Sequence, residues 1–223
     1  MNHSPSSPPA PIWPRLRLDF YDTDIIMTRW EDAHRLTSYP VAVDDVVSAC
    51  NQVTLGSGWL PPDTLFWKKQ GNQVALALFV PARRWRLATA NRTYHLPLPP
   101  LLFYGSEASY RVFALKRRPD LYRQGPGQRL ETQLYHFPGP NVYLTGSICR
   151  GETPFPSCAP HTIHQAVTLF LEGSLFNSDL SQGKCCTHPD DILQLWHRLD
   201  GRRRFPFSEL VFSGQTLASL YEK

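Results

Sequence analysis

Alternation of apolar and polar residues dominates the first half of the chain. Leu16, Leu18 and Phe20 alternate with charged residues, which predicts a strand. Ile25-Ile26-Met27 continues it after the turn Asp22-Thr23-Asp24, so Leu16–Trp30 is predicted to form a strand or a hairpin. Over Val43–Val53 the apolar residues recur at helical spacing instead, and Asp44 and Asp45 suit the first turn of a helix. The N-terminal part is therefore predicted to combine strand and helix.

Six short apolar segments, separated by turn residues, fill the middle of the chain. The turns are Gln70-Gly71-Asn72-Gln73, Ala90-Asn91-Arg92 and Gly105-Ser106-Glu107. Short sequential strands joined by tight turns predict an antiparallel meander. The expected strands are Leu65–Lys69, Val74–Val80, Arg84–Thr89, Thr93–Leu96, Leu101–Tyr104 and Tyr110–Lys116.

Helical spacing returns in the last third of the chain. Pro160–Gly173 carries apolar residues on one face, and Thr187-His188-Pro189-Asp190 resembles a capping box ahead of an apolar helix that ends at Gly201. We also expect a short strand over Phe205–Phe212 and a helical turn over Thr216–Tyr221. Residues 117–140 have no period and are expected to form a long loop. The whole pattern predicts an α+β fold, with an antiparallel β-meander and C-terminal helices.

Composition sets the expected organisation and compartment. With 223 residues and 42% hydrophobic content, the chain can build one core, so residues 15–223 are predicted to form a single domain. Residues 1–14 are rich in Ser and Pro and are predicted to be a disordered tail, without the charged and apolar blocks of a secretory signal. No segment approaches the roughly 18 apolar residues of a membrane span. Five cysteines without an export signal indicate reduced thiols, and we expect a cytoplasmic protein.

Charge and loop patterns narrow the set of partners. The net charge is +4, and the basic residues fall in three short clusters, Arg83-Arg84-Trp85-Arg86, Lys116-Arg117-Arg118 and Arg202-Arg203-Arg204. Such clusters are typical of solvated faces, so nucleic-acid binding is not favoured, and an acidic or mixed-charge protein partner fits them as well. There is no Gly-rich phosphate loop, so any ATP-dependent step would be performed by a partner.

The segment that offers chemistry is the run from Gly139 to Cys149. Cys149 follows Gly146-Ser147-Ile148 on irregular backbone, a setting that places a thiol near the surface. Asn141 lies eight residues upstream, and its side-chain amide offers N–H donors. Acyl transfer from a thioester to an amine passes through a tetrahedral oxyanion, which a fixed amide donor stabilises by about 2.7–4 kcal/mol.

This segment resembles the His-Pro-Asn flap and active-site cysteine of ubiquitin-conjugating enzymes. Pro140-Asn141-Val142-Tyr143, Gly146, Ile148 and Cys149 match the motif, and the order of meander, flap, cysteine and Pro160-led helix is also similar. Within that superfamily the chain most resembles the bacterial branch called PRTRC system protein B, or prokaryotic ubiquitin-conjugating family D. The resemblance implies a ubiquitin-conjugating-enzyme-like fold with N-terminal and C-terminal extensions. It also implies a thioester on Cys149 that Asn141 helps to pass to an amine.

The same resemblance implies partners. These are a ThiF-like activating enzyme, a ubiquitin-like modifier and a JAB-type peptidase from the same gene cassette; no cofactor is implied. The chain departs from the pattern because Gly139 stands where the family has the flap histidine, and because no basic first helix is visible. The acidic residue that tunes the acceptor amine is not fixed by the motif, and Glu152 is the candidate.

Alternatives to this hypothesis remain open from the residues alone. Cys149 could be a small buried apolar residue, and Pro140-Asn141 is also ordinary turn chemistry. Cys158, His161 and His164, and the Cys185-Cys186-Thr187-His188 run, lack the paired spacing of a structural zinc site, so no metal is expected. The rival functions are a non-catalytic binding module with the conjugating-enzyme fold and an unrelated cysteine hydrolase using a histidine.

Overall fold

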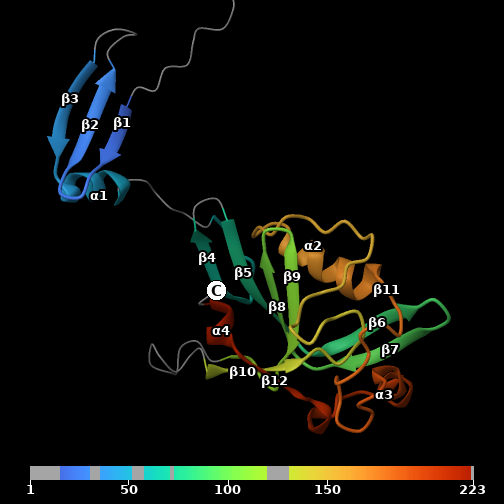
Figure 1. Cartoon of the computed structure of the whole chain (residues 1–223). Helices are drawn as coiled ribbons and strands as arrows, with labels where there is room; N and C mark the ends of the chain where they lie inside the picture. Colours follow the sequence, from blue (N-terminus) through green and yellow to red (C-terminus); the bar gives the residue numbers. More distant parts are fainter. Residues whose placement is uncertain (1–15, 31–35, 52–57, 71–72, 120–130, 222–223) are drawn as a thin grey trace, which may run out of the picture. The chain divides into compact units, whose positions relative to one another are not determined.

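The computed structural model describes residues 16–30, 36–51, 58–70, 73–119 and 131–221 (Figure 1). The chain divides into two compact units, Met1–Gly56 and Ser57–Lys223. The expected tail, residues 1–14, lies outside the described residues. The expectation of one domain over residues 15–223 stays a prediction. No helix in the described part of the chain is long and apolar enough to span a membrane.

The first unit is a small antiparallel sheet followed by a helix. Strands β1 (Leu16–Phe20), β2 (Ile25–Trp30) and β3 (Leu36–Val41) pair in that order, and α1 (Val43–Asn51) follows. The Tyr21 N–H donates to the Asp24 carbonyl at 2.8 Å and closes the predicted hairpin between β1 and β2. The third strand, β3, was not expected from the sequence.

The second unit is built on a six-stranded antiparallel sheet in the order β12-β10-β9-β8-β5-β4. The second predicted hairpin, β6 and β7, belongs to a smaller sheet in the order β11-β6-β7 and not to the large sheet. In the large sheet β5 therefore pairs directly with β8. All six expected strands are present. The strands of this unit are β4 (Thr64–Gln70), β5 (Gln73–Val80), β6 (Arg83–Thr89), β7 (Thr93–Leu98), β8 (Leu101–Ser106), β9 (Ser109–Ala114), β10 (Gln133–His136), β11 (Leu175–Phe176) and β12 (Phe212–Thr216).

Several elements differ from the sequence expectations. Strand β10 lies inside the expected loop, because it pairs with β9 and β12, which are distant in the sequence. The expected helix over Pro160–Gly173 is shorter and changes winding, with α2 over Ile163–Thr168 and a π-helix over Leu169–Gly173. The next helix, α3 (Ile192–Leu199), is capped by Asp191, whose side chain accepts from the Leu193 N–H, and not by the earlier Thr187.

The C-terminal expectations are partly right. A 3₁₀ turn, Phe207–Glu209, lies in the middle of the segment Phe205–Phe212 that was expected to be a strand, and β12 begins only at the last residue of that segment. The last helix, α4 (Leu217–Tyr221), forms as expected. The difference arises because β12 follows the position of its partner β10, which local propensity does not encode.

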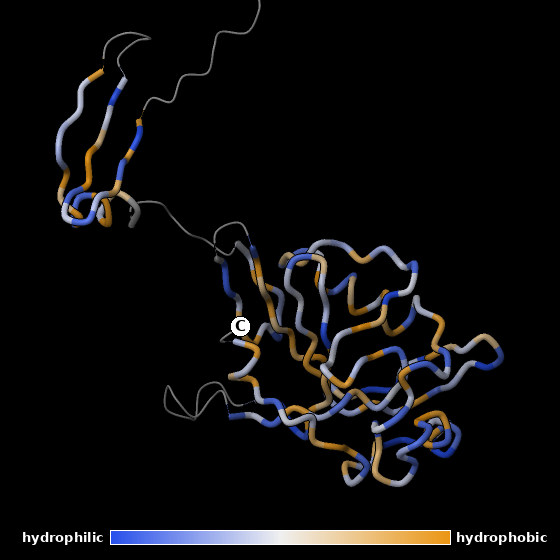
Figure 2. Tube along the Cα trace, in the orientation of Figure 1, coloured by the Kyte–Doolittle hydropathy of each residue, from blue (hydrophilic) through white to orange (hydrophobic). Residues whose placement is uncertain are grey.

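The large sheet has a core on each face. Side chains alternate along β5, so Leu76 and Leu78 enter one cluster while Ala77 and Phe79 enter the other. The first cluster includes α2 and α3 residues such as Trp196, and the second includes Leu217 and Leu220 of α4. Figure 2 shows this apolar character along the central strands.

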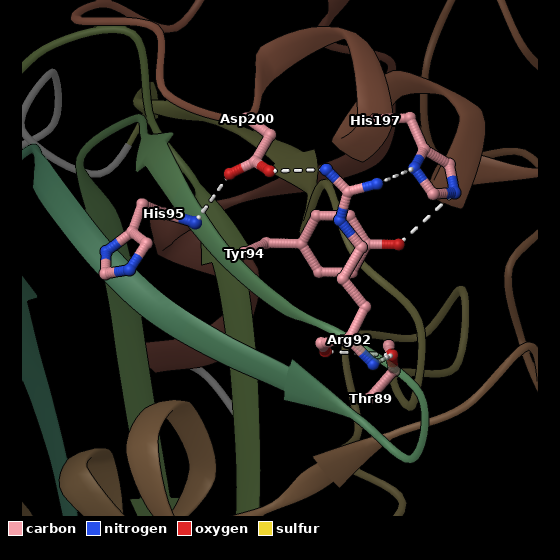
Figure 3. Close-up of polar contacts among 6 residues, drawn as sticks. All are labelled: Thr89, Arg92, Tyr94, His95, His197 and Asp200. Carbon is pink, nitrogen blue, oxygen red and sulfur yellow. Dashed lines mark hydrogen bonds and ion pairs between the residues drawn. The ribbon is translucent and has the colours of Figure 1, made fainter.

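A polar network joins the hairpin of β6 and β7 to α3 (Figure 3). The Arg92 guanidinium pairs with Asp200 at 2.8 Å, and the other Asp200 oxygen accepts from the His95 N–H at 2.9 Å. His197 lies 3.4 Å from Arg92 through Nδ1 and 3.2 Å from the Tyr94 hydroxyl through Nε2. These contacts fix α3, and α3 in turn contacts the segment that carries the candidate site.

Candidate functional site

The candidate thiol lies on a short loop hairpin, residues 137–149, which we call the flap. Val142 and Ile148 face each other across an antiparallel bridge. The Cys149 N–H donates to the Asn141 carbonyl at 2.8 Å, and the Tyr143 N–H donates to the Ser147 carbonyl at 2.9 Å. The spacing of eight residues between Asn141 and Cys149 therefore makes them neighbours across the hairpin. Cys149 is exposed, which confirms the predicted accessibility of its thiol.

The strand of the flap that leads to Cys149 is bound to the edge of β9. The Ile148 N–H donates to the Tyr110 carbonyl at 3.0 Å, and the Val112 N–H donates to the Gly146 carbonyl at 2.9 Å. Gly146 has φ of +84°, and a Cβ there would lie 2.2 Å from Cζ of Phe113. Only glycine fits, so the glycine of the motif is needed for close packing of the flap on the sheet.

Asn141 itself links the flap to β11. Its φ is +59°, a left-handed conformation that asparagine tolerates better than most residues. Its Nδ2 donates to the Leu175 carbonyl at 3.1 Å, and its Oδ1 accepts from the Asn177 N–H at 3.3 Å. The amide is thus oriented by two bonds, and one of its two N–H donors has no acceptor among the described residues.

Aromatic rings occupy the space that a side chain at position 139 would need. A Cβ at this position would lie 2.4 Å from Cε1 of Phe137 and 2.8 Å from Cζ2 of Trp196. The indole Nε1 of Trp196 donates to the Pro138 carbonyl at 2.8 Å, in a buried bond. The flap is therefore ordered by a tryptophan from α3, a residue that sequence reasoning assigned only to a helix.

Lys184 is a second residue that sequence reasoning missed. Its side chain is buried and its Nζ donates to the Val142 carbonyl. Burial lowers the pKa of Lys184 to about 8. No local pattern around Gly183-Lys184-Cys185 signals this position, since the contact joins residues 42 positions apart.

Glu152 takes no part in the contacts that join Asn141 to Cys149. It is exposed in the turn after Cys149, and within the described residues it has no hydrogen bond or ion pair. The neighbouring Arg150 extends away and donates to the Ala108 carbonyl at 2.7 Å. The structure therefore brings Asn141 to Cys149 but leaves Glu152 on the adjacent surface.

The other cysteines and histidines show different surroundings. Cys158 is buried, and burial raises the pKa of its thiol to about 11. Cys185 is also buried, and its Sγ donates to the His188 carbonyl at 3.2 Å. In the described ranges no three His, Cys, Asp or Glu side chains are grouped to hold a metal ion, and no histidine there is hydrogen-bonded to Cys149.

Comparison with known protein families identifies the family of this chain. The model described as prokaryotic E2 family D matches residues 42–213, which is more than three quarters of the chain. The match includes the whole flap and begins just before α1, so β1, β2 and β3 lie outside it. No curated protein and no solved structure matches the chain significantly.

Proposed function

Because the chain belongs to prokaryotic E2 family D, we propose that it carries a ubiquitin-like modifier as a thioester on Cys149 and passes it to an amine. Membership of this family supports a conjugating transferase activity in general terms. It also implies two types of partner, an activating enzyme and a ubiquitin-like modifier. One observation carries the specific proposal: Cys149 is exposed, and its backbone N–H donates to the Asn141 carbonyl. Both residues lie within the region that the family model matches.

The chemistry would run in two acyl transfers. A ThiF-like enzyme would activate the modifier's C-terminal carboxyl group, and the Cys149 thiolate would attack that carbonyl and expel the activating enzyme's leaving group. An acceptor amine would then attack the thioester carbonyl, lose a proton and release the Cys149 thiolate. The exposed position of Cys149 suits both steps, because each requires contact with another protein.

Asn141 and Glu152 would assist the second transfer. The N–H of Asn141 that has no described acceptor could stabilise the oxyanion, while the bonds to Leu175 and Asn177 hold the amide in place. Glu152, exposed three residues beyond Cys149, would attract the protonated acceptor amine. A JAB-type peptidase that reverses the conjugation and a cytoplasmic location complete the proposal.

A charging assay tests this function. With a ThiF-like enzyme, the modifier and ATP supplied, the wild type should form an adduct that disappears under reducing agent. Cys149→Ser should form either no adduct or an ester that survives reduction, because its oxygen is a poorer leaving group than sulfur. Cys186→Ser is the matched control, since Cys186 is also exposed, and it should charge normally. Charging that depends on Cys186 and ignores Cys149 would contradict the assignment.

Asn141→Ala separates the two transfers. This variant should still accept the modifier, but it should pass it on about 10²–10³-fold more slowly if the amide supplies an oxyanion donor. Single-turnover discharge to free lysine measures that step directly. An accessible thiol that never charges, in a protein that still binds the modifier, would favour the non-catalytic binding module instead.

A further inference from the structure

A cavity of about 330 Å³ lies beside the flap, between Val142 and the segment that ends at Lys184. Val142 and Ile148 are a non-hydrogen-bonded pair, because the hydrogen bonds between the two flap strands are made by the residues that flank them. The backbone N–H and C=O of Val142 therefore point away from the strand that carries Cys149. The Val142 carbonyl instead accepts from Nζ of Lys184. The cavity therefore lies at the opposite edge of the flap from the thiol.

Lys184 is the only cationic side chain of the cavity lining among the described residues, and it is 1% exposed. Its acceptor is a neutral carbonyl, and no carboxylate in the described ranges pairs with it. A buried ammonium without a counter-ion is costly, because the peptide carbonyl replaces only part of its hydration. Two of its three N–H donors remain available to a ligand in the cavity.

The remaining lining also lacks an anion. Ser178, Ser181 and Gln182 contribute polar side chains, none of which has a hydrogen bond to the described residues. Asp179 is adjacent in sequence, but its carboxylate accepts from Asn177 at 2.8 Å and does not line the cavity. The polar part of the cavity is thus rich in donors and has no carboxylate of its own.

Apolar side chains complete the lining, with Val142, Leu144 and Leu180 beside the polar residues. A lining that combines hydrogen-bond donors with aliphatic side chains suits a ligand with a charged head and a short apolar stem.

We propose that this cavity binds a carboxylate group, with Lys184 as its counter-ion and the serine and glutamine side chains as further donors. The carboxylate would come from a small aliphatic acid or from an acidic side chain of a polypeptide. The bound group would supply the negative charge that the described residues do not. This site is independent of the proposed thioester chemistry, because Lys184 and the cavity lie on the far edge of the flap from Cys149.

Calorimetric titration with propionate and with N-acetyl-glutamate α-amide tests the site on the full chain. Saturable binding of either supports the proposal, and the compound that binds more tightly identifies a free acid or a polypeptide side chain as the source. Propionamide has nearly the same shape without the charge and should bind at least about 10-fold more weakly. Equal affinity for propionate and propionamide, or no saturable binding of any carboxylate, would overturn the proposal.

Lys184→Met keeps the length of the side chain and removes the charge. It should weaken propionate binding by about 10-fold or more. Lys68→Met is the matched control, because Lys68 also donates to a carbonyl, that of Tyr221, but at an exposed position away from the cavity. Unchanged affinity in a folded Lys184→Met protein would contradict the assignment.

The pH dependence needs no variant. Because only protonated Lys184 pairs with an ionised carboxylate, affinity should be constant between about pH 7, where the carboxylate is fully ionised, and about pH 8, and it should fall about tenfold per pH unit above that. His136 on β10 is the neighbouring titratable group; burial and then the charge of Lys184 lower its pKa, so it is neutral over this range. Propionate should also raise the pKa of Lys184 measured by NMR. A Lys184 pKa unmoved by saturating propionate would refute the pairing.

Discussion

Replacing Gly139 with alanine should destabilise the protein through contact alone. The φ of Gly139 lies outside the left-handed region, so alanine can adopt the backbone conformation without strain. The new methyl group would lie 2.4 Å from the Phe137 ring and 2.8 Å from the Trp196 ring, well inside van der Waals contact. Both rings are fully buried and have little room to move.

The magnitude follows from two opposing effects. Overpacking a dense core costs about 1–3 kcal/mol. Alanine also lowers the entropy of the unfolded chain, which returns about 0.4–1 kcal/mol. With the middle of each range, the net loss for Gly139→Ala is about 1.3 kcal/mol. For a domain of this size each kcal/mol lowers the melting temperature by about 2–4 °C, so the expected fall is about 3–5 °C.

Thermal unfolding followed by near-ultraviolet circular dichroism measures this change. Gly173→Ala is the matched control, because its Cβ would meet Leu169 at an ordinary 3.6 Å and its φ is also unrestrictive. The control should melt at or slightly above the wild-type temperature. A second variant, Phe137→Leu combined with Gly139→Ala, should relieve part of the clash and show coupling of at least about 0.5 kcal/mol. Gly139→Ala melting as high as Gly173→Ala would refute the argument that the rings fill this space.

Two further predictions concern buried polar contacts. Trp196→Phe keeps the ring but leaves the buried Pro138 carbonyl without its donor, so urea unfolding should show a loss of about 1–3 kcal/mol; an unchanged midpoint would mean that the bond contributes nothing. Burial opposes ionisation of Glu209, but hydrogen bonds from Thr187 and Arg198 outweigh it and lower its pKa. Its stabilisation should therefore be complete above about pH 4.3, the ordinary glutamate value, and be lost as the pH falls through the lowered pKa; Glu209→Gln should flatten that part of the stability-against-pH curve.

The chemistry of the flap could be inferred from sequence because it is local. Asn141 and Cys149 are separated by eight residues, and the hairpin that closes between them makes the two neighbours through hydrogen bonds within the flap itself. The requirement for glycine at position 146 is also visible as part of the motif, although its cause, the Phe113 ring, is not. Family membership followed from these few positions together with the order of the elements.

The residues that hold the flap could not be inferred in this way. Trp196 reaches Pro138 across 58 residues, and Lys184 reaches Val142 across 42. Each lies in a segment whose pattern shows only a helix or a loop. Their roles depend on how separate elements pack, and hydrophobic periodicity records that a side chain is buried but not which distant group it meets.

The sequence by itself determined the strands of the meander, the helices near their observed positions and the pairing of Asn141 with Cys149. These features depend on alternation, turn residues and short spacing, which act within about ten residues. The tertiary structure alone decided that β6 and β7 leave the large sheet, that β10 forms within the expected loop, and that the Asn141 amide bonds to β11. The physical reason is that these features require backbone groups far apart in the chain to satisfy one another, and only the packed arrangement selects the partners.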